Sequence, residues 1–307
     1  MAKRLASATQ VNVFVSQALA SLEQGAKSWL YAADRLYQLP LGVIGVAIGV
    51  ALLPRLARAV ASQDIVEEST AIDEGVNLSM AFTLPAAAAL LAMPFFLMHG
   101  FWTGGVFHDS DARNTADALF QYGWGVPAFV LLRILAPPFY ARQDMRRPMI
   151  FALVGVVLNV AVGAGAFFLL RSQGHPGFVG LAVGTSIAAW SNVLLLAFTL
   201  LRERVWRPSA DTLSRLLRVI IASAIMAAAL GFMSAHREEI VSLVSHTLHI
   251  RLGAKELAVA VVCLIGATIY VVAALAVGAI RPRDFITAFR RPAGAAPTAD
   301  LPMGGDA

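Results

Sequence analysis

Apolar residues occur along the chain in runs of about 20, and polar residues gather between the runs. A run of that length can cross the hydrocarbon core of a bilayer as an α-helix, which satisfies its own backbone hydrogen bonds. The pattern therefore predicts an all-α chain with about eight spans. We place them at roughly residues 10–36, 40–61, 76–98, 119–141, 149–171, 178–201, 213–235 and 257–280.

Proline and glycine mark the expected breaks between and within these spans. The pair Leu39–Pro40 is predicted to turn the chain and open the second span, because proline lacks the backbone N–H that continues a helix. The pair Pro137–Pro138 should interrupt the fourth span. The segment 174–177, GHPG, should separate the fifth span from the sixth.

Composition supports a polytopic membrane protein. The chain is 58% hydrophobic and 14% charged, whereas soluble domains are about 25% charged. Lys and Arg residues favour one set of span ends, which the positive-inside tendency places in the cytoplasm together with both termini. The 99–118 and 236–256 loops are then expected to face outward. The arginines of the cytoplasmic set are Arg55, Arg58, Arg142, Arg146, Arg147, Arg202, Arg204, Arg207, Arg215, Arg218, Arg281, Arg283, Arg290 and Arg291.

The same composition argues against several other classes of protein. Basic residues sit at the ends of apolar runs rather than in one surface patch, so we expect no nucleic-acid partner. The single cysteine, Cys263, allows no internal disulfide. The six histidines lack metal-ligand spacing, and no phosphate-cradling glycine motif is present. We therefore expect neither a metal site nor a cofactor.

The first span carries polar groups where a membrane helix usually has none. On one helix, with residues separated by roughly 100°, the stripe members lie within about 60° of Glu23, and Arg35 lies at the shoulder. A charge facing hydrocarbon costs at least a few kcal/mol, so the stripe should face a protein interior or a hydrated cavity. Glu23 and Lys27 could instead only pair with each other, and Asp34–Arg35 could snorkel to the interface. The members are Asn12, Ser16, Glu23, Lys27, Asp34 and Gln38.

Arg133 is a second intramembrane charge, in the fourth span ahead of the two prolines. A guanidinium there needs an anion or a hydrated cavity. Snorkelling to the headgroups at the cytoplasmic side is the alternative.

Three stretches occur in order along the chain: ADRLYQLPLGVIGVAIGVALLPRLARAVAS from Ala33, FWTGGVF from Phe101 and LAPPFYARQDMRRPM from Leu135. Together they resemble the MurJ (MviN) family of lipid II flippases. The resemblance implies a second six-helix lobe over residues 1–206 and a C-terminal helix pair over 207–283 that forms a groove for a lipid tail. A disordered tail would follow over 284–307. The first lobe of that fold has no counterpart here, so we expect a partial chain whose missing partner is that lobe.

The resemblance also implies a function, namely translocation of lipid II across the bacterial cytoplasmic membrane by alternating access, without covalent chemistry. By motif match, Arg35 would be a cavity arginine on the first helix of the lobe that faces the pyrophosphate. Asp34 and Gln38 would orient the substrate, although relatives often have glutamate at the position of Gln38. Arg133 would add positive potential. The roles of Glu23 and Lys27 rest on the stripe alone.

Two alternatives remain open at this point. One is export of another cargo by the same superfamily, such as a drug, an organic cation or a polysaccharide unit, which predicts cation coupling centred on buried carboxylates. The other is a membrane scaffold for cell-wall assembly that transports nothing. That scaffold predicts that neutralising the stripe leaves function intact.

Overall fold

The computed structural model describes residues 2–51, 53–248 and 253–279, and confirms the all-α prediction for them. Apart from an isolated bridge between Gly104 and Phe107, their regular structure is helical. The helices are α1 (Ala2–Ala20), α2 (Ala26–Ala51), α3 (Leu53–Ala61), α4 (Ile65–Ala92), α5 (Pro94–Trp102), α6 (Asp109–Gly123), α7 (Val126–Leu135), α8 (Pro137–Ala141), α9 (Arg146–Ser172), α10 (Phe178–Arg202), α11 (Ala210–Ala235), α12 (Arg237–Leu248) and α13 (Ala254–Ala276).

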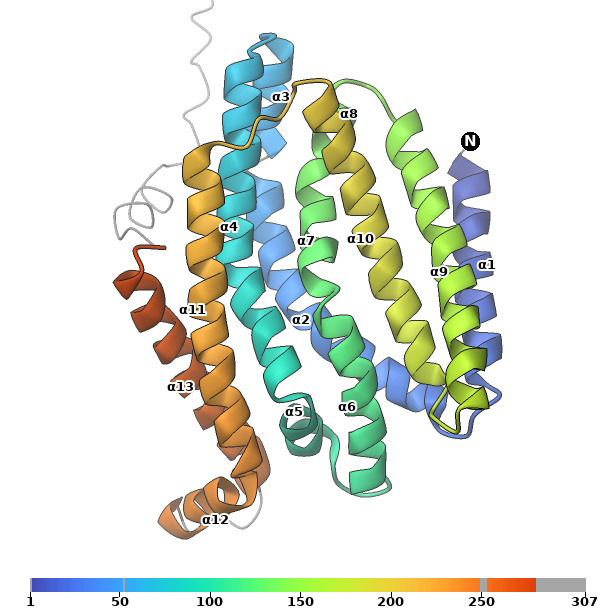
Figure 1. The fold of residues 1–307 in the computed structure, drawn as a ribbon, viewed down its shortest axis with the longest axis vertical. Coiled ribbons are helices and arrows are strands. Elements are labelled where there is room, and N and C mark those ends of the chain that lie inside the picture. The colour runs from blue at the N-terminus through green and yellow to red at the C-terminus, as the bar shows by residue number, and fades with distance from the viewer. Residues whose placement is uncertain (1, 52, 249–252, 280–307) are drawn as a thin grey trace, which may run out of the picture.

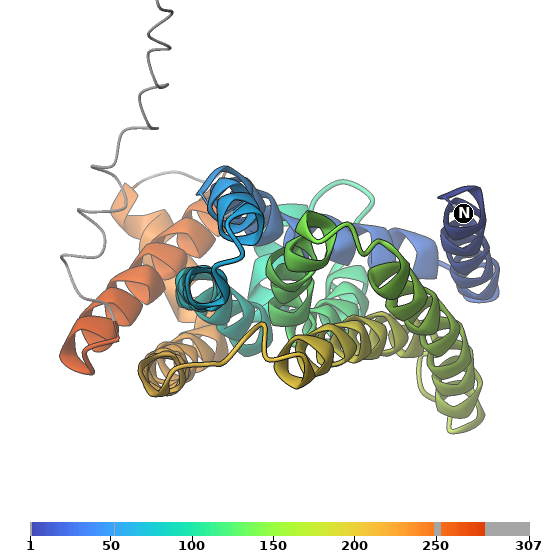
Figure 2. The same cartoon turned by 90° about the horizontal axis from the view of Figure 1, so that it is seen from above.

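The long helices pack side by side as one bundle (Figure 1). The N-terminus, α3 and α8 lie at one end, which we call the α3 end; α5, α12 and the turn between α1 and α2 lie at the other, the α5 end. Seen from above, α1 and α9 occupy one side of the bundle and α13 the opposite side, next to α11 (Figure 2).

Six helical stretches in the described ranges are long and apolar enough to cross a membrane: Ile65–Ala92, Asp109–Ala141, Arg146–Ser172, Phe178–Arg202, Ala210–Ala235 and Lys255–Ala276. They correspond to the third to eighth predicted spans. The break predicted at Pro137–Pro138 separates α7 from α8 inside the second of them. The first two predicted spans, 10–36 and 40–61, fall on α1, α2 and α3. These helices are outside this set, so the total of eight spans stays a prediction.

Glycines let α9 and α10 approach closely. A Cβ added at Gly184 would lie 2.7 Å from the Cα of Gly163, and one at Gly180 would lie 2.6 Å from the backbone of Ala166. Real Cβ atoms do not come that close to backbone, so these positions require glycine. Small residues at helix crossings are the usual route to tight packing in membranes.

The predicted boundary between the first two spans is wrong. The chain turns over 21–25 instead, where Gly25 adopts a φ of +86° that other residues rarely take. The pair Leu39–Pro40 lies inside α2, which continues to Ala51. A membrane-type helix tolerates an internal proline where neighbouring groups satisfy the freed backbone. The six polar residues assigned to one helical stripe are therefore divided between α1, the turn and α2.

The two predicted outward loops are also partly helical. The first contains the end of α5 and the start of α6, joined by a short turn, and the second contains α12. Between α5 and α6, the backbone N–H of Gly104 donates to the carbonyl of Phe107 at 3.2 Å, and the reverse bond has the same length. Gly105 supplies the positive φ of this turn.

The predicted division of the chain into a lobe over 1–206 and a helix pair over 207–283 stays a prediction. The pair packs on α4, where the Tyr270 hydroxyl donates to the Ala81 carbonyl at 2.5 Å. The linker into α11 is fixed by Asp73, which accepts hydrogen bonds from the Trp206 indole and the Ser209 backbone at 2.7 and 2.9 Å. The expected tail, 284–307, lies outside the described residues.

Candidate functional site

Helix α2 has one face that packs into the bundle. Tyr37 is buried and its ring lies against those of Tyr122 on α6 and Phe129 on α7, with centroids 4.8 and 5.4 Å away. Near the start of α2, the Trp29 indole donates to Asp111 of α6 at 2.9 Å and packs against Phe178 of α10. These aromatic contacts fix the rotation of α2 and thereby decide which residues it presents on its other side.

The opposite face of α2 is exposed and polar. Its exposed residues recur at helical spacing and so lie in one row: Lys27, Tyr31, Arg35 and Gln38. The guanidinium of Arg35 lies over the Tyr31 ring, 4.7 Å from its centroid. Gln38 donates a hydrogen bond to Asp34. We call this row with Asp34 the α2 face.

The positive charges of Arg35 and Lys27 are not neutralised by a carboxylate of the described residues. Within the described part of the chain, neither side chain forms an ion pair with a carboxylate. Asp34 is engaged by Gln38 rather than by its neighbour in sequence. A cation–π contact orients a guanidinium without neutralising it, so Arg35 remains able to bind an anion.

Arg133 reaches the same helix from α7. Its guanidinium donates to the backbone carbonyl of Leu41 at 3.1 Å. Leu41 is six residues beyond Arg35, a rise of about 9 Å along a helix. Lys27, Arg35 and the Arg133 contact therefore follow one another along α2 from the α5 end toward the α3 end.

Glu23 lies outside this face and contacts the start of α10 rather than Lys27, so its role in substrate binding stays a prediction. It lies in the turn before α2, and its two carboxylate oxygens accept hydrogen bonds from the backbone of Gly177 and Phe178 at 2.8 and 3.1 Å. Those N–H groups are free because they begin α10. Glu23 thus caps α10 from 154 residues away in sequence, where a negative charge is favourable.

The turn that displaces Glu23 also corrects the position of Arg35. The resemblance implied a cavity arginine on the first helix of the lobe, but Arg35 lies on the second, α2. Asn12 and Ser16 remain on α1. One stripe along a single helix is thus replaced by a row on α2 alone.

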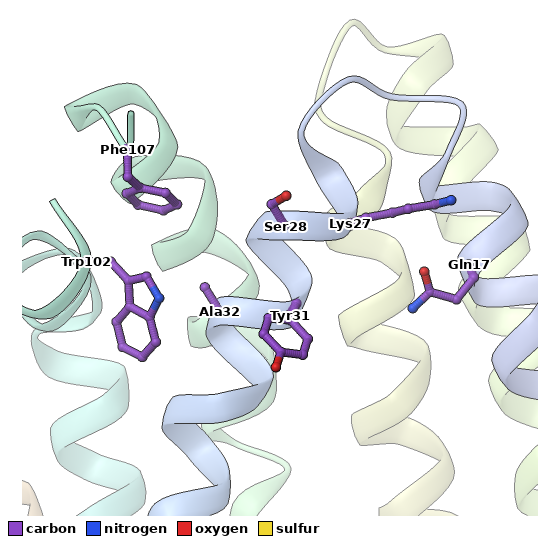
Figure 3. Close-up of a pocket in the computed structure, with 7 residues that line it drawn as sticks. All are labelled: Gln17, Lys27, Ser28, Tyr31, Ala32, Trp102 and Phe107. Atoms are coloured by element: carbon purple, nitrogen blue, oxygen red, sulfur yellow. The ribbon is translucent and has the colours of Figure 1, made fainter. Parts of the chain in front are cut away.

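An open pocket of about 440 Å³ lies at the α5 end of the α2 face. In Figure 3, Lys27 points toward Gln17 of α1, while Trp102 and Phe107 lie across from Ala32 and Ser28. The sequence analysis singled out Lys27 but missed the aromatic wall, although Trp102 and Phe107 both belong to the FWTGGVF stretch. That stretch reaches α2 only through tertiary packing, because α6 packs on α2 and α5 packs on α6.

Three arginines at the α3 end form ion pairs. Arg142, from the LAPPFYARQDMRRPM stretch, binds the buried carboxylate of Glu68 through two hydrogen bonds of 2.6 and 3.2 Å. Arg55 pairs with Glu67 at 2.8 Å and also with Glu74. Arg147 pairs with Glu203 and with Asp144. The carboxylates at this end therefore hold helices together.

In the described ranges, no group of three or more His, Cys, Asp or Glu side chains is placed to hold a metal ion. The cationic α2 face offers arginine, lysine, amide and phenol groups instead. These groups suit an anionic, hydroxyl-rich ligand.

The fold and the α2 face together define an all-α polytopic membrane protein with a cationic, polar helix face. A family model described as "Lipid II flippase MurJ" matches residues 4–252, and the chain belongs to that family.

Curated relatives carry the same description. The chain is 40% identical over 222 residues to the "Probable lipid II flippase MurJ" of Rhizobium meliloti (strain 1021), which covers 72% of this chain and 40% of the relative. It is 34% identical over 274 residues to the "Probable lipid II flippase MurJ" of Rhizobium tropici, a match that covers 89% of this chain and 49% of the relative. The chain thus spans less than half the length of these relatives.

A solved structure, "Lipid II flippase MurJ, inward closed conformation", shares the fold. The TM-score is 0.67 at 21% identity, over 92% of this chain and 53% of that one. The chain thus spans about half the length of that structure.

Proposed function

We propose that this chain forms the part of a lipid II flippase whose α2 face binds the anionic head group of lipid II. The observation that carries the proposal is the guanidinium of Arg35, which lies on an exposed helix face and has no carboxylate partner among the described residues. Lipid II joins a polyprenyl tail to its sugars through a pyrophosphate. Arginine binds such oxyanions through paired, charge-assisted hydrogen bonds.

The neighbours of Arg35 support the same assignment. The hydrogen bond between Asp34 and Gln38 presents an amide and a carboxylate beside the guanidinium, where they can orient sugar hydroxyls or peptide groups. Arg133, held against α2 by the Leu41 carbonyl, adds positive potential toward the α3 end. Alternating access would carry the bound head group from one side of the membrane to the other.

The C-terminal pair suits contact with lipid. Large apolar side chains on α11 and α13 are exposed, among them Leu217, Phe232, Leu264 and Val272. We assign this surface to membrane lipids and to the polyprenyl tail. We assign the arginine-rich α3 end to the cytoplasm and propose that the chain lies in the bacterial cytoplasmic membrane with both termini inside.

Cation-coupled export of another cargo has less support from the geometry. Such coupling needs a carboxylate that is free to bind and release a cation. The buried acids Glu68 and Asp73 are instead occupied, Glu68 by Arg142 and Asp73 by the linker before α11.

Ligand preference tests the proposal directly. The chain in lipid nanodiscs is exposed to lipid II, to undecaprenyl phosphate, which lacks the sugars and one phosphate, and to tetraphenylphosphonium as an organic cation. Native mass spectrometry then reports occupancy. We expect lipid II to bind most tightly. Preferential binding of the organic cation would contradict the proposal and favour the export of another cargo.

A further inference from the structure

The pocket at the α5 end of the α2 face is chemically unlike the rest of that face. Around Arg35 the groups suit a phosphate; in the pocket they combine one ammonium group, an amide, hydroxyls and two aromatic rings. The members used below are Gln17, Lys27, Ser28, Tyr31, Trp102 and Phe107.

The walls of this pocket are fixed by hydrogen bonds that meet at one carboxylate. Asp111 accepts from the Trp29 indole of α2 through one oxygen at 2.9 Å. Its other oxygen accepts from the backbone N–H of His108 at 2.9 Å, directly after Phe107. Asp111 therefore ties the helix that carries Lys27 to the turn that carries Phe107, which fixes these two walls of the pocket relative to each other.

The lining predicts the class of ligand. Trp102 and Phe107 are both half-buried, so their rings are held in place while part of each faces the pocket. Pyranose rings present an apolar C–H face that packs on aromatic side chains, while their hydroxyls bond to amides and hydroxyls such as those of Gln17 and Ser28. The Lys27 ammonium, which has no carboxylate partner among the described residues, matches a carboxylate. Sugar and carboxylate together describe a glycopeptide.

Distance along α2 links this pocket to Arg35. Lys27 precedes Arg35 by eight residues, a rise of about 12 Å. Tyr31 lies between them, lining the pocket and contacting the Arg35 guanidinium. A ligand with its pyrophosphate at Arg35 would therefore extend its next groups along Tyr31 into the pocket. In lipid II those groups are the disaccharide and its acidic peptide branch.

We propose that this pocket is a separate subsite for the sugar–peptide part of the head group, with Lys27 binding a peptide carboxylate and Trp102 and Phe107 packing against a sugar ring. This inference rests on the proposed function, because it identifies the ligand as the same lipid II molecule whose pyrophosphate meets Arg35.

The test separates the two ends of the ligand. The chain in nanodiscs is titrated with a soluble disaccharide–pentapeptide that has no pyrophosphate, with the same compound after amidation of its carboxylates, and with inorganic pyrophosphate. Lys27→Gln should weaken binding of the acidic glycopeptide roughly tenfold, as expected for a lost charge-assisted hydrogen bond. It should leave the amidated compound and pyrophosphate unchanged. Trp102→Ala should weaken both glycopeptides alike.

Lys255→Gln is the matched control, because Lys255 is another exposed lysine at the α5 end, at the start of α13. The subsite is refuted if Lys27→Gln and Lys255→Gln bind the acidic glycopeptide equally, or if amidation does not weaken binding to the unmodified chain. Failure of pyrophosphate to bind, with the glycopeptide still bound through Lys27, would instead contradict the role proposed for Arg35 and support the pocket.

Discussion

Two groups of arginines in this bundle differ in what surrounds them. At the α3 end, Arg142 meets the buried Glu68 and Arg55 meets two glutamates. On the α2 face, and counting only the residues that the structure describes, Arg35 contacts the ring of Tyr31 and Arg133 contacts a backbone carbonyl, with no carboxylate at either. A paired guanidinium at a helix junction contributes to stability, whereas an uncompensated one on an exposed face is available to a ligand. The two groups of arginines cannot be told apart in the sequence. The group that each guanidinium contacts in the structure indicates whether the arginine contributes to stability or is available to a ligand.

Breaking the Arg142–Glu68 pair should have the largest effect on stability. The Glu68 side chain is 3% exposed, and Arg142→Gln would leave a buried carboxylate without its counter-charge. We expect a loss of about 3 kcal/mol in unfolding free energy. Thermal unfolding in detergent would measure it as a lowered midpoint. Arg146→Gln, at an exposed arginine four residues away, is the control, and equal midpoints for the two variants would contradict the structural role of the pair.

Removing the cap on α10 should have an intermediate effect. Glu23→Ala frees the two backbone N–H groups at Gly177 and Phe178, at an expected cost of about 1–2 kcal/mol. Glu23→Gln should cost less because one amide oxygen still accepts. The same unfolding assay applies, with Gln24→Ala at the adjacent exposed position as control. If Glu23→Ala unfolds like the control while reducing lipid II binding, Glu23 would return to the substrate site.

A larger side chain at Gly177, next to the Glu23 carboxylate, gives an independent check of the same contact. A Cβ at Gly177 would lie 2.8 Å from both the Glu23 carboxylate and the Phe167 carbonyl. Gly177→Ala should therefore destabilise the fold by about 1 kcal/mol or more through overpacking. The double variant Glu23→Ala/Gly177→Ala should lose less unfolding free energy than the two single variants together, because Glu23→Ala removes the carboxylate that the new Cβ at position 177 would clash with. Strict additivity of the unfolding free energies would show that the two sites do not interact.

The smallest effect expected is a pH dependence at the α5 end. Burial, with the nearby Lys255 and Arg237, lowers the pKa of His99 below its ordinary value of 6.5, although Asp109 opposes the shift. A histidine whose pKa is depressed in the folded state contributes stability above its unfolded pKa, and that contribution is lost as the pH falls below about 6.5. The unfolding midpoint of the unmodified chain should be slightly lower at about pH 5.5 than at about pH 7.5. The difference between the two pH values should be smaller for His99→Gln. An equal fall in both would exclude His99 as the source.

Much of the fold was predictable because apolar run length alone sets where membrane helices can form. The third to eighth spans follow from it, and so does the break at Pro137–Pro138. The first helix boundary was not predictable in the same way. Proline usually breaks helices in water, but α2 continues through Pro40. The turn at 21–25 instead depends on Gly25 and on the hydrogen bonds that Glu23 accepts from the start of α10, 154 residues later.

The candidate site was predicted in part for similar reasons. Asp34, Arg35, Gln38 and Lys27 fall on one helix face because their spacing is local, and the structure places all four on α2. Glu23 falls outside this face because the chain turns at 21–25, so one helical projection does not extend through that segment. Trp102 and Phe107 line the same pocket as Lys27 through tertiary packing of segments far apart in the sequence, which no local pattern contains.

The most direct test measures both ligand binding and stability in two matched variants, one at an arginine assigned to binding and one at an arginine assigned to stability. Arg35→Gln and Arg142→Gln make the same chemical change, and each is measured for lipid II binding in nanodiscs and for its unfolding midpoint. We expect Arg35→Gln to bind lipid II roughly tenfold or more weakly with an unchanged midpoint, since an exposed charge-assisted contact is lost without a buried partner. Arg142→Gln should lower the midpoint and bind lipid II normally below it. Unchanged lipid II binding by Arg35→Gln would contradict the assignment of the α2 face as the head-group site.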